Sequence, residues 1–182
     1  MNTQFVLIRH APVIAGGLLY GRSDLPAQLP DIPARPEWDG GAVFLTSPAG
    51  RCRATAAALA PQARWREIAA LWEQDFGLWE GRAYAQIPDL GPLSRRDLAA
   101  HRPPQGESFL DVVARVRPVF TADYRAAQVV VMAHAGVIRA ALSLALGDEA
   151  AGLAFAIDPL SQTVLTRAGG DWAIGCVNRS LV

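Results

Sequence analysis

Short runs of apolar residues recur along the chain, and three of them contain no polar position. They cover residues 5–8, 42–45 and 129–132. Uninterrupted apolar runs of this length are typical of strands that are buried on both faces of a parallel sheet. Residues 63–68 predict one further strand.

Other segments carry the spacing of helices. Apolar residues recur every three or four positions over residues 107–125, which predicts one amphipathic helix with Pro118 inside it. The Ala-rich residues 51–59 follow a Thr-Ser-Pro start signal and predict a second helix. A third helix is expected to follow position 134 and to be closed by Gly147.

The order of these segments indicates the fold class. Strands and helices alternate through most of the chain, which is typical of an α/β fold with a largely parallel sheet. Residues 162–166 and 171–177 predict a terminal hairpin, whereas residues 12–41 are rich in Gly and Pro and predict loop. With 182 residues, the chain is expected to form a single domain over residues 1–182.

Charge and residue usage narrow the functional classes. The 17 basic residues equal the 17 acidic ones, so the chain lacks the basic surplus of a nucleic-acid or anionic-membrane binder. Every basic residue is Arg, which excludes Schiff-base, P-loop and general-base lysines. Cys52 and Cys176 form no CxxC pair, so reduced thiols and a cytoplasmic location are expected. No apolar run has the length of a membrane span.

Two of the three histidines occupy equivalent places in the pattern. His10 follows the strand predicted over residues 5–8, and His134 follows the strand over residues 129–132. Ligands of open α/β sheets bind beyond the carboxyl ends of the strands, so both imidazoles are predicted to face one pocket. The alternative is a pair of unrelated histidines with local hydrogen bonds. Arg9 ends an apolar run, where an arginine is costly unless a partner meets it.

Arg51 lies in the first turn of the helix predicted after residues 42–45. A cation is unfavourable there because the helix dipole favours anions at its N-terminus. An anion held between Arg51 and that helix end would resolve the conflict. Two guanidiniums and two imidazoles that converge on one point predict a site for a phosphate dianion.

Glu73 is the candidate proton donor. It lies in a loop flanked by two aromatic residues, Trp72 and Phe76, and a carboxyl beside apolar rings is suited to general-acid work. Asp75 and Glu80 lie in the same loop, and position alone does not separate the three carboxyls.

Five segments together carry a resemblance that single motifs do not. They are Leu7-Ile8-Arg9-His10, residues 46–56 with Ser47-Pro48 and Arg51, residues 73–81 beginning at Glu73, Gly106-Glu107-Ser108-Phe109, and residues 134–139 beginning at His134. In this order they resemble the motifs of the histidine phosphatase superfamily, the phosphoglycerate-mutase-like enzymes. The resemblance covers nearly the whole chain.

The resemblance implies a fold, a mechanism and roles. The fold would be a three-layer α/β/α sandwich around a mostly parallel sheet. His10 would be the nucleophile that forms a phosphohistidine, while Arg9, Arg51 and His134 would hold the phosphate oxygens. Glu73 would protonate the leaving oxygen. Because the cations neutralise the phosphate charge, the resemblance implies neither a metal nor another cofactor, and the partner would be a small phosphorylated metabolite.

The sequence departs from the family pattern in three places. Ala11 and Ala135 replace motif glycines. If either position required a positive φ, the alanine would lower stability by on the order of 1 kcal/mol. We expect instead that both alanines have an ordinary backbone conformation and that their methyl groups narrow the pocket. The usual Asn is also absent, and residues 14–17 stand in its region.

One further segment points to a narrower group. Tyr20-Gly21-Arg22-Ser23-Asp24 resembles a segment of small bacterial phosphatases of this family, and alpha-ribazole phosphatases are the nearest of these. Tyr20 and Arg22 are candidates for substrate contacts at the pocket rim, although a surface role is nearly as plausible for Arg22. The short chain favours a phosphatase over a mutase, which needs a larger lid. A phosphoglycerate-type mutase and a non-catalytic phosphate-binding module remain as alternatives.

Overall fold

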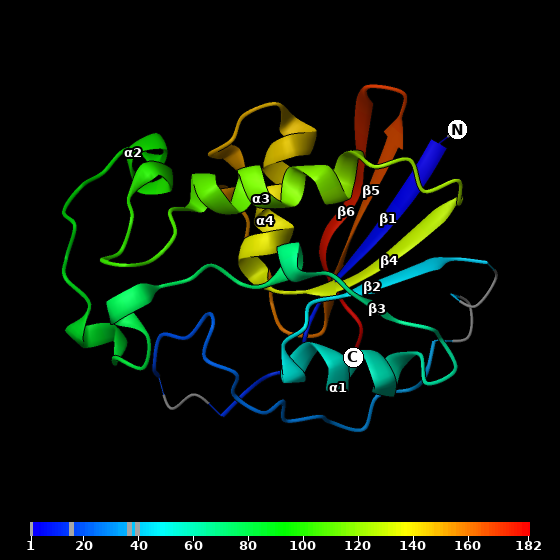
Figure 1. Ribbon diagram of the computed structural model, residues 1–182, viewed down its shortest axis with the longest axis horizontal. Helices are drawn as coiled ribbons and strands as arrows, with labels where there is room; N and C mark the ends of the chain where they lie inside the picture. Colours follow the sequence, from blue (N-terminus) through cyan, green and yellow to red (C-terminus); the bar gives the residue numbers. More distant parts are fainter. Residues whose placement is uncertain (1, 15–16, 36–37, 39–40) are drawn as a thin grey trace.

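The protein is built around one six-stranded sheet (Figure 1). The computed structural model describes residues 2–14, 17–35, 38 and 41–182. The strand order is β3-β2-β4-β1-β5-β6. The strands are β1 (Asn2–Arg9), β2 (Val43–Thr46), β3 (Arg66–Glu67), β4 (Gln128–Ala133), β5 (Ser161–Ala168) and β6 (Asp171–Ser180).

Three of the five strand pairs in the sheet are parallel and two are antiparallel. β3, β2, β4 and β1 pair in parallel, as their apolar runs predict. β5 pairs antiparallel with β1 and with β6. The last two strands form the predicted hairpin, and both are longer than the sequence pattern indicates.

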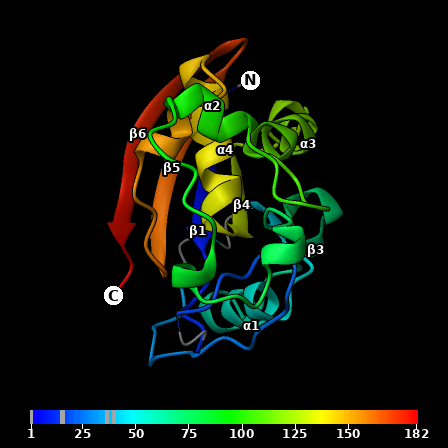
Figure 2. The same cartoon turned by 90° about the vertical axis from the view of Figure 1, so that its left-hand side faces the viewer.

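Helices cover both faces of the sheet, which confirms the three-layer α/β/α sandwich. α1 packs against one face of the sheet, whereas α3 and α4 pack against the other (Figures 1 and 2). The helices are α1 (Gly50–Leu59), α2 (Arg95–Ala100), α3 (Phe109–Thr121) and α4 (Ala135–Leu146). No helix in the described part of the chain is long and apolar enough to cross a bilayer.

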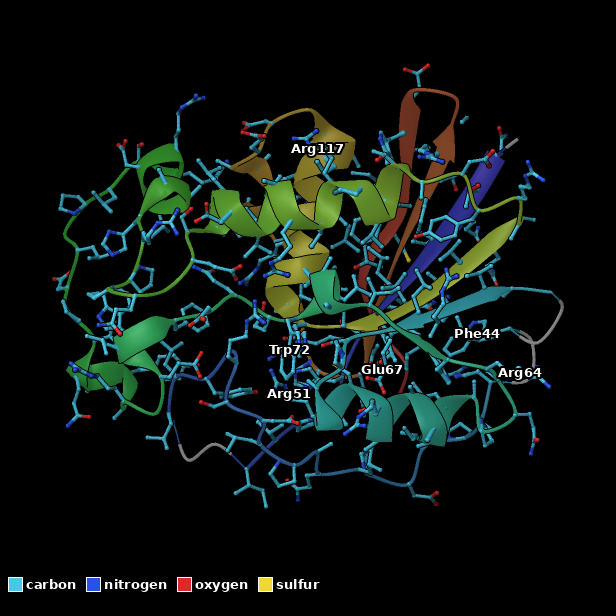
Figure 3. All side chains as sticks on the ribbon, viewed as in Figure 1. Phe44, Arg51, Arg64, Glu67, Trp72 and Arg117 are labelled. Atoms are coloured by element: carbon cyan, nitrogen blue, oxygen red, sulfur yellow. The ribbon has the colours of Figure 1, made fainter. Side chains whose placement is uncertain are left out.

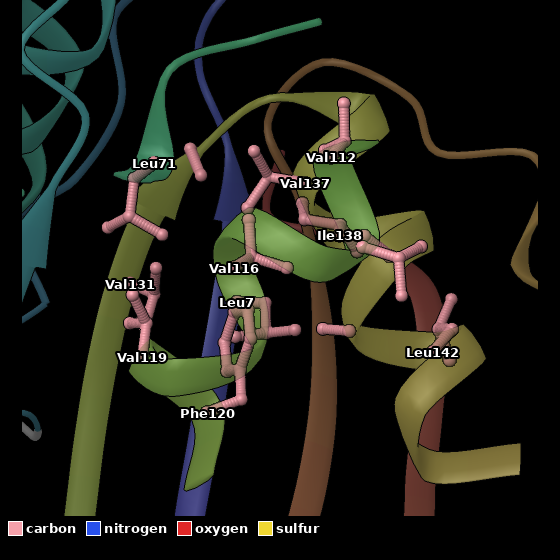
Figure 4. Packing of buried hydrophobic residues seen from close by; sticks show 14 of the residues in the cluster. Leu7, Leu71, Val112, Val116, Val119, Phe120, Val131, Val137, Ile138 and Leu142 are labelled. Carbon is pink, nitrogen blue, oxygen red and sulfur yellow. The ribbon is translucent and has the colours of Figure 1, made fainter. Parts of the chain in front are cut away.

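The alternation of side chains along the central strands separates two cores. Phe5 and Leu7 of β1 pack on the side of α3 and α4, where Phe120 and Ile138 contribute to the same cluster (Figure 4). Val6 and Ile8 face the opposite side, toward α1. Both faces of β1 and β4 are therefore covered, which explains their uninterrupted apolar runs.

Two predicted elements are shorter than expected. The strand predicted over residues 63–68 contains only Arg66–Glu67, because β3 is an exposed edge strand and Trp65 packs edge-on against Phe44. α3 begins after Ser108, whose side chain and backbone exchange hydrogen bonds with Asp111 in a capping box. It ends at Thr121 and not at residue 125.

Candidate active site

The register of two neighbouring strands brings the predicted histidines together. Arg9 of β1 is paired with Ala133 of β4, so the next residue of each strand leaves the sheet at the same edge. The ring centroids of His10 and His134 lie 5.1 Å apart at 69°. The two imidazoles therefore belong to one site, and the alternative of unrelated strand-end histidines is wrong.

His10 is oriented by its own backbone neighbour. Its Nδ1 lies 2.6 Å from the carbonyl oxygen of Ala11; because that oxygen can only accept a hydrogen bond, the ring hydrogen is on Nδ1. Nε2 is left as the nitrogen with a free lone pair, and no described residue hydrogen-bonds it. Burial lowers the pKa of His10 to about 3; the Ala11 carbonyl opposes this shift, and the charges of Arg51 and Arg9 add to it. His10 is therefore neutral, as a nucleophile must be.

His134 is fully buried and held at both ring nitrogens. A guanidinium nitrogen of Arg51 lies 3.2 Å from Nδ1, and the Ser47 hydroxyl lies 2.8 Å from Nε2. Because arginine can only donate, Nδ1 accepts, and Nε2–H donates to Ser47. Burial is the largest cause that lowers the pKa of His134, followed by the charges of His10, Arg51 and Arg9.

The pKa shifts of the two histidines predict how stability depends on pH. Both pKa values lie below 6.5 in the folded state, so their contribution to stability is complete above pH 6.5 and is lost as pH falls below 6.5; for His10 the loss continues toward pH 3. Each unprotonated histidine then lowers the free energy of unfolding by about 1.4 kcal/mol per pH unit. We expect the melting temperature to fall between pH 7 and pH 5, and to fall less in His10→Gln. An equal fall in both proteins would contradict the assignment.

Arg51 ties the site to the loop that contains Tyr20. Its guanidinium is fully buried and donates to the carbonyl oxygens of Gly21 at 2.6 Å and Ser23 at 2.9 Å. The guanidinium carbon also lies 5.3 Å from the centre of the Tyr20 ring. Figure 3 shows Arg51 at the start of α1. Residues 20–24 are therefore fastened over the carboxyl edge of the sheet.

The anion at the N-terminus of α1 is a side chain of the protein itself, the carboxylate of Asp24. Both carboxylate oxygens of Asp24 accept from the backbone N–H of Gly50, at 2.8 and 2.9 Å. One of them lies 3.5 Å from Arg51. The expectation of a ligand anion between Arg51 and this helix end is thus wrong, because Asp24 satisfies the helix end and pairs with Arg51.

A cavity of about 320 Å³ opens next to His10; we refer to it as the His10 cavity. Arg9, Tyr20 and Glu73 share its walls with His10, and so does Arg139 of α4. Arg9 donates to the Ile157 carbonyl oxygen at 2.5 Å. Burial raises the pKa of Tyr20, although the charges of Arg9 and Arg51 oppose the shift. Arg51 and His134 do not line this cavity, so of the two guanidiniums and two imidazoles predicted to converge only Arg9 and His10 face it. The His134 ring packs edge-on against His10, and Arg51 bonds to His134.

The structure separates the three carboxyls of the acidic loop. Glu73 lines the His10 cavity, and its carboxylate accepts from the backbone N–H of Gly136 at 3.2 Å. A side chain at Gly136 would overlap the Glu73 carboxylate, so only glycine permits this approach. Glu80 instead accepts from the N–H groups of Arg22 and Ser23. Asp75 accepts from Gly77, which leaves Glu73 as the carboxyl that faces His10.

Arg115 of α3 holds the backbone of the acidic loop. It donates to the carbonyl oxygens of Ala70 at 2.7 Å and Trp72 at 3.0 Å. It also forms a bidentate ion pair with Glu107, with N···O distances of 3.0 and 2.9 Å. Sequence reasoning missed Arg115, although its position eight residues after Glu107 of the Gly-Glu-Ser motif was a signal. By fixing this backbone, Arg115 determines where the Glu73 carboxyl lies.

Arg22 lies beside the site and not in the walls of the His10 cavity. Its guanidinium carbon lies 5.6 Å from the centre of the Trp72 ring, and its terminal nitrogen lies 3.6 Å from Glu107. Gly21, next to it, touches the backbone of Gln74 so closely that a side chain would overlap. Arg22 thus joins the loop of Tyr20 to the acidic loop.

The alanines that replace motif glycines cause no backbone strain. Neither Ala11 nor Ala135 has a positive φ. The N–H of Ala11 donates to the Thr55 hydroxyl at 3.0 Å, and Ala135 begins α4 and lines the His10 cavity. The region where the family has an Asn includes residues 15–16, which lie outside the described residues.

Comparison with known proteins bears on the family of this chain. Residues 34–180 match the histidine phosphatase superfamily, branch 1, a range that begins after Arg9 and His10. A bifunctional protein of Mycobacterium tuberculosis is 41% identical over 91 residues, which are 47% of this chain and 25% of that protein. The chain spans about a quarter of the length of the first curated relatives that it matches.

Solved structures share the fold over the whole chain. A putative alpha-ribazole-5'-P phosphatase from Escherichia coli has a TM-score of 0.80 and 21% identity, and covers 98% of this chain and 97% of its own. A mycobacterial glucosyl-3-phosphoglycerate phosphatase, solved with VO3, has a TM-score of 0.80 and 25% identity, and covers 97% and 99%. With more than half of its residues matched to the family and the sheet, the helices and the paired histidines in place, this chain belongs to the histidine phosphatase superfamily.

Proposed function

We propose that this chain is a metal-independent phosphomonoesterase that acts on a small phosphorylated metabolite through a phosphohistidine on His10. One observation carries the proposal: a neutral His10, with its Nδ1 hydrogen held by Ala11, lines a cavity together with Glu73 and Arg9. A nucleophile, a proton donor and a cation thus border the same space.

The reaction follows from these positions. Nε2 of His10 attacks the phosphorus atom, the ester P–O bond breaks, and the leaving alcohol oxygen takes a proton from Glu73. Water then attacks the phosphohistidine, gives its proton to the Glu73 carboxylate, and releases inorganic phosphate and neutral His10. The Ala11 carbonyl stabilises the positive charge that the ring acquires in the first step.

An unpaired donor supports an anionic ligand. The Nε atom of Arg9, which lines the His10 cavity, is buried and has no hydrogen-bond partner among the described residues. A buried donor without a partner costs about 1–3 kcal/mol, and phosphate oxygens would remove that cost. The guanidiniums of Arg9 and Arg139, which line the His10 cavity, would supply the charge neutralisation that phosphoryl transfer requires, so we propose no metal.

The proposal extends to the substrate and to the cellular location. Two solved structures with this fold are called an alpha-ribazole-5'-P phosphatase and a glucosyl-3-phosphoglycerate phosphatase. The segment from Tyr20 to Asp24 favours alpha-ribazole phosphate as the first substrate to assay. The balanced charge and the free thiols of Cys52 and Cys176 support a cytoplasmic enzyme without nucleic-acid or membrane partners.

The proposal is tested by phosphate release from a panel of esters in the presence of EDTA. The panel contains p-nitrophenyl phosphate, alpha-ribazole phosphate and the phosphoglycerates. We expect inorganic phosphate from at least one ester at a rate that EDTA does not change. Isomerised phosphoglycerate without phosphate release would indicate a mutase. A rise in melting temperature with phosphate or vanadate, but no turnover of any ester, would indicate a binding module.

A further inference from the structure

A second cavity of about 470 Å³ adjoins the His10 cavity; we refer to it as the side cavity. Half of the residues that line the side cavity also line the His10 cavity, among them Gln74, Phe76 and Arg139. Its other wall residues lie between positions 79 and 103. This segment contains α2 and lies beyond the carboxyl edge of the sheet (Figure 1). The two cavities therefore share walls, and an ester held at His10 can extend from one into the other.

The position of the proton donor relates the side cavity to the leaving group. Glu73 lines the His10 cavity, and its neighbours Gln74 and Phe76 line both cavities. In the proposed reaction the leaving oxygen takes its proton from Glu73, so the rest of the alcohol begins next to these shared walls. A volume of this size is typical of a small-molecule pocket.

The walls of the side cavity are mostly apolar. Trp79, Ile87, Leu90 and Leu98 line it, and among the described residues no carboxylate does. Within that part of the chain its one permanently charged side chain is Arg139, whose Nε donates to the Phe155 carbonyl oxygen at 2.9 Å. A sugar or carboxylate here would leave most of its polar groups unpaired, which costs binding energy.

Two of the large side chains in these walls are open to solvent. Tyr84 is 60% exposed and Leu98 is 46% exposed. Covering such surface by an apolar group is favourable by about 25 cal/mol per Å². Flat rings suit this task because aromatic faces and edges pack on one another.

His101 adds one polar atom to the apolar walls. Its ring is stacked on Trp79 with centroids 5.4 Å apart at 19°. Its Nε2 is buried and has no hydrogen-bond partner among the described residues. An imidazole nitrogen can donate or accept according to its tautomer, so a ligand with one matching atom would satisfy it.

We infer that the side cavity binds the leaving group of the substrate, and that this group is a planar, apolar ring system with one hydrogen-bonding atom for His101. The inference rests on the proposed phosphatase function and specifies its substrate class. It favours phosphate monoesters of alcohols that carry such a ring system over phosphoglycerates and over phosphorylated sugars that carry none.

The test compares two esters of primary alcohols, 2-(1-naphthyl)ethyl phosphate and ethyl phosphate, so that leaving-group acidity is similar. We expect a kcat/KM at least roughly tenfold higher for the naphthyl ester, from the apolar area buried. Leu98→Asp should lower kcat/KM for the naphthyl ester more than for ethyl phosphate. Leu93→Asp is the matched control, because Leu93 is 42% exposed and lines neither cavity; it should leave both values unchanged.

The outcomes separate the two proposals. Equal kcat/KM for both esters, or the same loss in Leu98→Asp for both, overturns the side cavity while the phosphatase function stands. If no ester of any kind releases phosphate, the phosphatase function is overturned. Calorimetric binding of 2-(1-naphthyl)ethyl phosphate to wild type and Leu98→Asp then decides the side cavity independently: tighter binding by wild type supports it, and equal binding refutes it.

Discussion

Replacing His10 by alanine is expected to lower kcat for p-nitrophenyl phosphate by more than about 10⁴-fold. The reason is that the variant loses the only group that the proposed reaction bonds to phosphorus. The neighbouring histidine cannot substitute for it, because both ring nitrogens of His134 are engaged by Arg51 and Ser47. The measurement is the initial rate of nitrophenol release.

The same experiment includes a direct readout of the intermediate. Wild type quenched in base during turnover should carry a phosphoryl group that is lost in acid, as seen by intact mass, and His10→Ala should carry none. His10→Gln controls for the volume removed and should be equally inactive. A rate within tenfold of wild type in both variants, at unchanged melting temperature, would remove His10 from the mechanism.

Glu73→Gln is expected to lower kcat for an alkyl phosphate by roughly 10²–10⁴-fold, the usual contribution of a general acid. The effect on p-nitrophenyl phosphate should be smaller, because nitrophenolate leaves without a proton. Glutamine retains one oxygen that accepts from Gly136 and gives up only the local hydrogen bond from the N–H of Gln74, so the fold should be unaffected. Rates for ethyl phosphate and p-nitrophenyl phosphate, measured in parallel, give the comparison.

Asp75→Asn is the matched control for this prediction. Asp75 lies in the same loop, and asparagine keeps the oxygen that accepts from the N–H of Gly77. We expect it to keep most activity on both esters. If Asp75→Asn shows the substrate-dependent loss and Glu73→Gln does not, the proton donor has been misassigned.

Much of the fold could be predicted from the apolar pattern because the central strands are buried on both faces. In β1 and β4, a polar residue on either face would enter one of two cores, so the apolar runs are uninterrupted. Residues 63–68 are different, because an edge strand has fewer neighbours to bury it. Their apolar residues serve other contacts, such as that of Trp65 with Phe44, and only two residues pair with β2.

The same reasoning located the two histidines. A parallel pair of strands in register delivers its next residues to one edge, so the sequence pattern indicated that His10 and His134 would meet. It could not indicate that Asp24 occupies the N-terminus of α1. That carboxylate comes from a loop 26 residues earlier in the chain than Gly50, and no periodicity marks where such a loop returns.

What the sequence by itself determined is therefore the sheet, the helices on its faces and the residues at its carboxyl edge. These features depend on short-range periodicity and on burial, and both are reflected in whether each residue is apolar or polar. Only the tertiary structure decided which of Glu73, Asp75 and Glu80 faces His10, and it did so through Arg115 and Gly136. Loop backbones are positioned by hydrogen bonds to distant elements, and those bonds leave no regular pattern along the chain.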